Sequence, residues 1–123
     1  MTVPADDIVA IQQLVARYNH AIDGGDAEGW GNCFTPEGSF QISGREPTVG
    51  REALAEIVRR RADGARHVTT NMLIEGDGNA ATMRAYLEVL RAREVSVTGS
   101  YTDTLVKVDG QWLFEHRLFT GDD

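Results

Sequence analysis

The feature that most constrains the fold is a change in hydrophobic periodicity near Arg66. Before it, apolar residues recur every three or four positions, which is typical of amphipathic helices. After it they recur every second position, which predicts strands at residues 66–74, 80–90, 95–108 and 111–119. Asp77-Gly78 and Asp109-Gly110 predict tight hairpin turns between consecutive strands. Helices followed by antiparallel strands predict an α+β fold with the helices on one face of a curved sheet.

The first half of the chain predicts three helices. The first carries one apolar stripe, made of Ile8, Ile11, Val15, Tyr18 and Ile22. Gly24-Gly25 ends this helix, and Asp26 is the expected N-cap of a short second helix. The second helix is expected to bury Trp30, Cys33 and Phe34. A turn at residues 35–38, a short strand at 39–42 and a third helix at about 51–61 follow, and the arginines at 59–61 are expected to form a solvated helix end.

Length and charge exclude several classes of protein. A chain of 123 residues predicts one domain, residues 1–123, with one core and room for one pocket. The net charge of −7 and the lack of a basic stripe argue against a nucleic-acid partner. No apolar run approaches the ~20 residues of a membrane span, and residues 1–7 lack the features of a secretion signal. With Cys33 as the single cysteine, we expect a cytoplasmic protein without a disulfide or a thiolate metal site.

The two hairpin turns predict which strand residues share a face. The first turn places His67 opposite Glu88, Thr69 opposite Tyr86 and Asn71 opposite Arg84. The second turn places Asp103 opposite His116 and Leu105 opposite Phe114. Between these hairpins, the pairing that keeps like faces together sets Tyr86 beside Tyr101 and Arg84 beside Asp103.

This register predicts a polar cluster that continues into an apolar row, which is Leu73, Leu105, Trp112 and Phe114. The cluster is His67, Asn71, Arg84, Tyr86, Glu88, Tyr101, Asp103 and His116. Because the apolar row requires burial, we expect the helices to cover the cluster, so that it lines a cavity. The opposite face is a candidate homodimer surface, made of Val68, Thr70, Met72, Met83, Ala85, Leu87, Thr102, Thr104 and Val106.

Several segments resemble SnoaL-like proteins of the nuclear transport factor 2-like superfamily. They are Tyr18 to Asp26, Trp30, Phe34-Thr35-Pro36, Gly50 to Leu54, Arg66-His67 with Asn71, Gly99 to Asp103, and Asp109 to Trp112. The resemblance covers nearly the whole chain. It implies a cone of three helices on a strongly curved antiparallel sheet, a pocket inside the cone, and a dimer. Members include isomerases, polyketide cyclases, epoxide hydrolases, dehydratases and non-catalytic binding proteins, so the resemblance implies a fold more than an activity.

The local pattern is most similar to scytalone dehydratases. These use an Asp at the end of the first helix and a His at the start of the first long strand, positions that Asp23 and His67 match here. Other family positions differ: Ile22 stands where the family has a tyrosine, Arg91 stands near the second active-site histidine, and the family's serine and asparagine fall at about Gly99 and Tyr101. Scytalone itself is therefore a poor candidate for the substrate.

An Asp23–His67 pair is suited to acid–base chemistry, because a carboxylate fixes the tautomer of an imidazole. The alternative is that Asp23 caps the glycine turn and His67 bonds Glu88. Likewise Tyr18, Tyr86 and Tyr101 are either hydrogen-bond donors to a substrate oxygen or core residues with satisfied hydroxyls. Asp103 and His116 form either a second acid–base pair or an ion-pair network with Arg84, while Asn71 contacts either substrate or Arg84.

These residues predict a cofactor-independent dehydratase, isomerase or cyclase. The expected catalytic residues are Asp23 and His67, and the expected substrate is a small, largely apolar carbonyl or hydroxylated ring compound. The expected substrate-binding residues are Tyr18, Asn71, Arg84, Tyr86, Tyr101, Asp103 and His116. No metal is expected, because the histidines lack metal-ligand spacing. A non-catalytic binding or dimerisation module and an epoxide hydrolase that uses Asp23, Arg84 and Asp103 remain alternatives.

Overall fold

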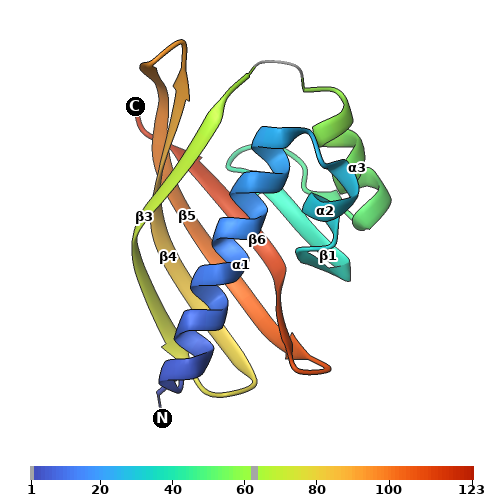
Figure 1. Ribbon diagram of the computed structural model, residues 1–123, viewed down its shortest axis with the longest axis vertical. Coiled ribbons are helices and arrows are strands. Elements are labelled where there is room, and N and C mark those ends of the chain that lie inside the picture. The colour runs from blue at the N-terminus through green and yellow to red at the C-terminus, as the bar shows by residue number, and fades with distance from the viewer. Residues whose placement is uncertain (1, 62–63) are drawn as a thin grey trace.

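Helices lie on one face of a twisted, open sheet in a computed structural model that describes residues 2–61 and 64–123 (Figure 1). The helices are α1 (Ala5–Gly24), α2 (Ala27–Gly31) and α3 (Arg51–Arg59). The strands are β1 (Phe34–Ile42), β2 (Thr48–Val49), β3 (Arg66–Gly76), β4 (Ala80–Arg91), β5 (Glu94–Val108) and β6 (Gln111–Gly121). Their order in the sheet is β2-β1-β6-β5-β4-β3. This architecture confirms the predicted α+β fold class.

The sheet is mixed, whereas a purely antiparallel sheet was predicted. The correction concerns β1, which runs parallel to β6 and antiparallel to β2. Strand β1 begins at Phe34, so the predicted turn at 35–38 lies inside the strand, where its pairing with β6 shifts between Phe34 and Ser39. Helix α1 runs along the sheet, while α2 and α3 lie together near β1 (Figure 1). None of the described helices has the length and apolar character needed to cross a membrane.

The predicted apolar stripe attaches α1 to the sheet. The buried residues of α1 are Ile11, Leu14, Val15, Tyr18, Ala21 and Ile22, whereas Ile8 of the predicted stripe is only partly buried. Gly25 ends the helix with a left-handed backbone (φ 75°), and its N–H bonds carbonyl groups of the last turn, as expected for a glycine cap. Asp26 then caps α2 by accepting a hydrogen bond from the Gly29 N–H at 3.0 Å. The chain reversal between α1 and α2 is thus determined by local sequence.

The first hairpin has a different register from the predicted one. His67 pairs with Val89 and Thr70 with Tyr86, and a β-bulge then shifts the register so that Leu73 pairs with Arg84. Asn71, in the bulge, has φ 55°, a left-handed conformation that asparagine tolerates better than most residues. The bulge inverts the alternation, so Met72 and Ile74 turn toward the core.

The second hairpin follows the prediction only near its turn. Leu105 pairs with Phe114 as predicted. A second bulge then leaves Glu115 without a partner in the register, so His116 pairs with Thr104 and Arg117 pairs with Asp103. The predicted pairing of Asp103 with His116 is therefore wrong by one residue.

The side chains of β4 alternate regularly between the two faces of the sheet, and the prediction that Met83, Ala85 and Leu87 lie on the outer homodimer face is wrong. The inward side chains of β4 are Ala81, Met83, Ala85, Leu87 and Val89, and the residues between them are exposed. Tyr101 pairs with Ala85 and Asp103 with Met83, so both point inward. The prediction that Arg84 and Tyr86 share a face with them is wrong, because both lie on the outer face.

Candidate active site

A cavity of about 410 Å³ lies between the helices and the inner face of the sheet. Its apolar lining is Ile22, Trp30, Phe40, Ile42, Ile57, Leu87, Val89, Val97 and Phe119. Its polar lining is Tyr18, Arg45, Glu46, Thr48, Arg61, His67, Arg91 and Tyr101. A mostly apolar pocket with a few polar groups is the usual form of a small-molecule site.

His67 lines this cavity, and Asp23 contacts it from the side where both residues border a separate, more open depression. Asp23 is in the last turn of α1 and His67 is the second residue of β3, so the end of one element lies beside the start of the other. His67 Nδ1 lies 2.7 Å from Asp23 Oδ1, and the His67 backbone N–H donates to both carboxylate oxygens at 3.1 Å. One turn earlier, Asn19 donates to Thr69 Oγ1 at 3.1 Å, which ties the same two elements together.

The burial of this pair suits proton transfer. The His67 side chain is 6% exposed and that of Asp23 is 23% exposed. A carboxylate that accepts from Nδ1–H fixes the imidazole tautomer and directs Nε2 to exchange a proton. The alternative prediction, in which His67 bonds Glu88, is wrong, because Glu88 lies on the exposed face of β4.

Tyr18 of α1 and Tyr101 of β5 line the cavity from opposite layers of the fold. Both are buried, and their rings meet edge to face with centroids 6.5 Å apart. Burial raises the pKa of both phenols, and the charge of Arg117 only partly opposes the increase. Both hydroxyls therefore stay protonated near neutral pH and can act as hydrogen-bond donors.

Arg117 of β6 packs against the rings of these tyrosines, although it is not among the predicted site residues. Its guanidinium carbon lies 3.4 Å from the ring centroid of Tyr101, 4.6 Å from that of Tyr18 and 4.5 Å from that of Phe114. Burial disfavours the charge of Arg117, but Asp103 and the two tyrosines outweigh it and raise the arginine pKa. No sequence signal indicates this contact, because the alternation that starts at Trp112 and Phe114 would place Arg117 outward, and only the bulge at Glu115 turns it inward.

The remaining predicted site residues do not line this cavity. Arg84, Tyr86 and Asn71 are exposed, the first two on the outer face of β4 and the third at the bulge. His116 contacts Ser39 Oγ through Nδ1 at 2.6 Å, not Asp103. Since Arg84 and the buried Asp103 lie on opposite faces of the sheet, the predicted Asp-Arg-Asp set of an epoxide hydrolase is not assembled.

Several residues that line the cavity were not predicted as site residues from the sequence. Trp30 is a core residue, as expected, and it also lines the cavity. Arg61 was expected in a solvated helix end, but it also borders the cavity, together with Arg45 and Arg91. Phe119 reaches the cavity because Gly99 leaves room for its ring: a Cβ at position 99 would lie 2.6 Å from that ring.

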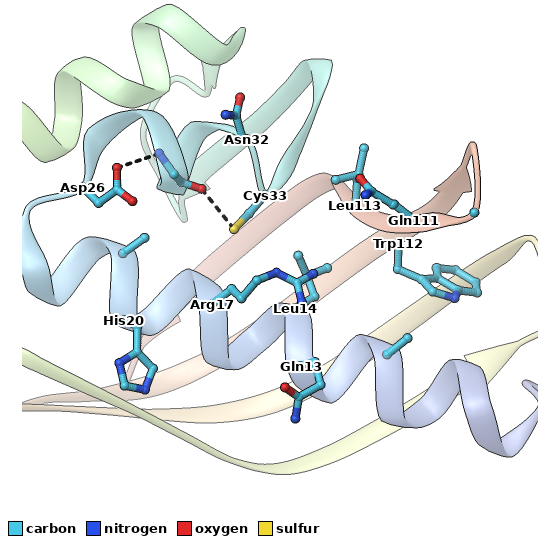
Figure 2. A pocket seen from close by; sticks show the side chains of 14 residues that line it. Gln13, Leu14, Arg17, His20, Asp26, Asn32, Cys33, Gln111, Trp112 and Leu113 are labelled. Carbon is cyan, nitrogen blue, oxygen red and sulfur yellow. Dashed lines mark hydrogen bonds between the residues drawn. The ribbon is translucent and has the colours of Figure 1, made fainter.

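A second depression is an open groove beside α1 and α2 (Figure 2). Figure 2 shows Arg17 extending from α1 into this groove, with Cys33 nearby. Cys33 donates to the Gly29 carbonyl at 3.4 Å, and burial raises its pKa to about 11. A thiol with so high a pKa is a poor nucleophile near neutral pH. Among the described residues, no three His, Cys, Asp or Glu side chains are placed to hold a metal ion.

Comparison with known proteins identifies the family and fold of the chain. A family model described as a SnoaL-like domain matches residues 4–118. A variant of Rv3472 from Mycobacterium tuberculosis, a protein of unknown function, is 39% identical, with a TM-score of 0.89, and the match covers 94% of this chain and 72% of that one. A Catenulispora acidiphila protein in complex with S-DNPA is 31% identical, with a TM-score of 0.80 and coverage of 97% and 96%.

A Nostoc punctiforme protein of unknown function with a cystatin-like fold is 27% identical to the chain. Its TM-score is 0.89, and the match covers 99% of this chain and 96% of that one. No curated protein matches the chain.

Proposed function

The chain belongs to the SnoaL-like family, and on that premise we propose that it is a cofactor-independent acid–base enzyme. Its substrate is a small, largely apolar carbonyl or hydroxylated ring compound, and its reaction is a dehydration, isomerisation or cyclisation. The observation that carries the proposal is the 2.7 Å contact between His67 Nδ1 and Asp23 Oδ1 at the border of an apolar cavity. The similar Catenulispora acidiphila protein has a small-molecule complex, which supports a ligand in this fold.

In the proposed mechanism, His67 is the general base. With Nδ1–H held by Asp23, Nε2 removes a proton from a carbon next to the substrate carbonyl. Tyr18 or Tyr101 donates a hydrogen bond to the carbonyl oxygen as negative charge develops there. The imidazolium then returns its proton, either to another carbon in an isomerisation or to a departing hydroxyl in a dehydration. Asp23 stabilises the imidazolium throughout.

This proposal is tested with 2-tetralone, a bicyclic ketone with acidic protons next to its carbonyl. In deuterated buffer, proton NMR follows the exchange of those protons, and we expect the protein to accelerate it. His67→Ala should reduce the acceleration by at least about 100-fold. His20→Ala is the matched control, because His20 is an exposed histidine of α1.

Equal exchange rates in wild type and His67→Ala would refute the assignment of His67. If the wild type binds 2-tetralone without accelerating exchange, the result favours the alternative of a non-catalytic binding module. The two variants have to be compared at equal folded concentration, which far-UV circular dichroism measures.

We also propose that two copies pair through the outer face of the sheet. Tyr86 is 60% exposed there, and Leu73 and Val68 are 57% and 36% exposed. Arg84 and Glu88 flank Tyr86 on the same face of β4. A two-fold axis through Tyr86 would place Arg84 of one copy beside Glu88 of the other, as an isologous interface requires. We place this dimer in the cytoplasm, where Cys33 stays a thiol.

A further inference from the structure

The two tryptophans of this chain differ in how their indole N–H groups are satisfied. Trp112 donates to Asp7 Oδ1 at 2.8 Å. Trp30 is 1% exposed, and no described residue accepts a hydrogen bond from its Nε1. An indole nitrogen is only a donor, and buried donors are nearly always paired. The exception at Trp30 therefore needs an explanation.

The side chain of Trp30 forms part of the wall of the 410 Å³ cavity. Its ring packs against two other cavity-lining rings, with centroid distances of 5.2 Å to Tyr18 and 6.0 Å to Phe40. The Asp26 cap at the start of α2 fixes the short helix that carries Trp30.

A second unmatched donor lies against the same tyrosine. Arg117 Nη1 is buried and has no acceptor among the described residues, while the guanidinium carbon lies 4.6 Å from the centroid of the Tyr18 ring. Asp103 already accepts from the other two nitrogens of Arg117, at 3.0 and 3.2 Å. Two buried donors near Tyr18, Trp30 Nε1 and Arg117 Nη1, therefore lack an acceptor, and an electron-rich oxygen is the group that they would bind.

We infer that Trp30 is a substrate-binding residue whose indole N–H donates a hydrogen bond to a carbonyl or enolate oxygen of a ring compound bound beside Tyr18. The inference rests on the proposed function, because it uses the same cavity, and it names the group that this end of the cavity recognises. The volume equals that of roughly 14 water molecules at about 30 Å³ each, which suits a bicyclic ketone.

The test compares 2-tetralone with tetralin, which has the same ring skeleton but no oxygen. In ¹⁵N-labelled protein the two indole N–H signals are resolved by NMR and assigned with Trp30→Phe and Trp112→Phe. We expect saturating 2-tetralone to move the Trp30 indole proton downfield by more than tetralin does, because hydrogen bonding deshields it. The Trp112 signal, already bonded to Asp7, should stay in place with both compounds.

Binding constants give a second measurement. Trp30→Phe should weaken 2-tetralone binding by about 3- to 10-fold, the net effect of one hydrogen bond, and should change tetralin binding less. If both compounds lose the same affinity, or if 2-tetralone binds without a larger Trp30 shift, the inference is overturned. The NMR comparison uses wild-type protein, so it remains decisive even if Trp30→Phe is unstable.

The two proposals can fail separately. A Trp30 shift without accelerated proton exchange would support the binding role of Trp30 and reject the catalytic proposal. Accelerated exchange that depends on His67, without any Trp30 shift, would keep the catalytic proposal and reject this inference.

Discussion

Arg117 and Asp103 form a buried, two-pronged ion pair on neighbouring strands. Arg117 Nε lies 3.0 Å from Asp103 Oδ1, and Nη2 lies 3.2 Å from Oδ2. Both side chains are fully buried. Because the same guanidinium lies 3.4 Å from the centroid of the Tyr101 ring, the pair connects the interior of the sheet to the cavity. The guanidinium therefore holds the rings of Tyr18 and Tyr101 in place, and the two opposite charges of the pair neutralise each other.

Arg117→Met should lower the free energy of unfolding by about 3–5 kcal/mol, because it leaves the Asp103 carboxylate buried without its partner. Arg117→Met combined with Asp103→Leu should recover most of this loss, since no buried charge remains. Urea denaturation of the wild type and both variants measures the two effects. A double variant no more stable than the single one would show that packing, not the unpaired charge, dominates.

Asp23→Asn should lower the rate of 2-tetralone exchange by about 10- to 100-fold while leaving the fold intact. Asparagine can still accept from the His67 backbone N–H, but it lacks the charge that stabilises an imidazolium. The same NMR exchange assay measures the loss. Asp26→Asn is the control, because asparagine caps a helix as well as aspartate does, and it should keep the wild-type rate. Equal rates in the two variants would contradict the role of Asp23.

Stability at acid pH should depend on Asp7. The hydrogen bond from Trp112 and the contact with Lys107 lower the Asp7 pKa below its ordinary 3.8. A lowered pKa adds stability above the unfolded value, and this stability is lost as the pH falls through the folded value. The difference in melting temperature between wild type and Asp7→Asn should therefore be largest above about pH 4 and shrink below it.

Asp6→Asn is the matched control for this titration, because Asp6 is the exposed neighbour of Asp7 in the first turn of α1. Its melting-temperature difference from wild type should be small at every pH. A gap between wild type and Asp7→Asn that stays constant from pH 6 to pH 3 would contradict the proposed titration.

Tyr86→Glu should dissociate the proposed dimer, because it places a carboxylate at the two-fold axis, where the partner's copy of the same charge would face it. Sedimentation velocity at several concentrations measures the change, with a monomer as the expected species. Val9→Glu is the control, since Val9 is a similarly exposed apolar residue on α1, at 55%. A wild-type chain that sediments as a monomer at every concentration would reject the interface.

Local signals in the sequence determined the helical half of the fold. The stripe of α1, the glycine turn at its end and the Asp26 cap all lie where local patterns place them. The positions of Asp23 and His67 also follow from order along the chain, because one ends the first helix and the other starts the first long strand. The alternation of Ala81, Met83, Ala85, Leu87 and Val89 also indicates the buried face of β4.

The tertiary structure alone decided the register of the sheet and the set of residues around the cavity. The bulges at Asn71 and Glu115 each add one residue to a strand, and one added residue turns every later side chain to the other face. This is why His67 shares a face with Val89 and not with Arg84 and Tyr86, and why Arg117 is inside. A bulge is stabilised by packing between strands distant in sequence, so local periodicity does not reveal it.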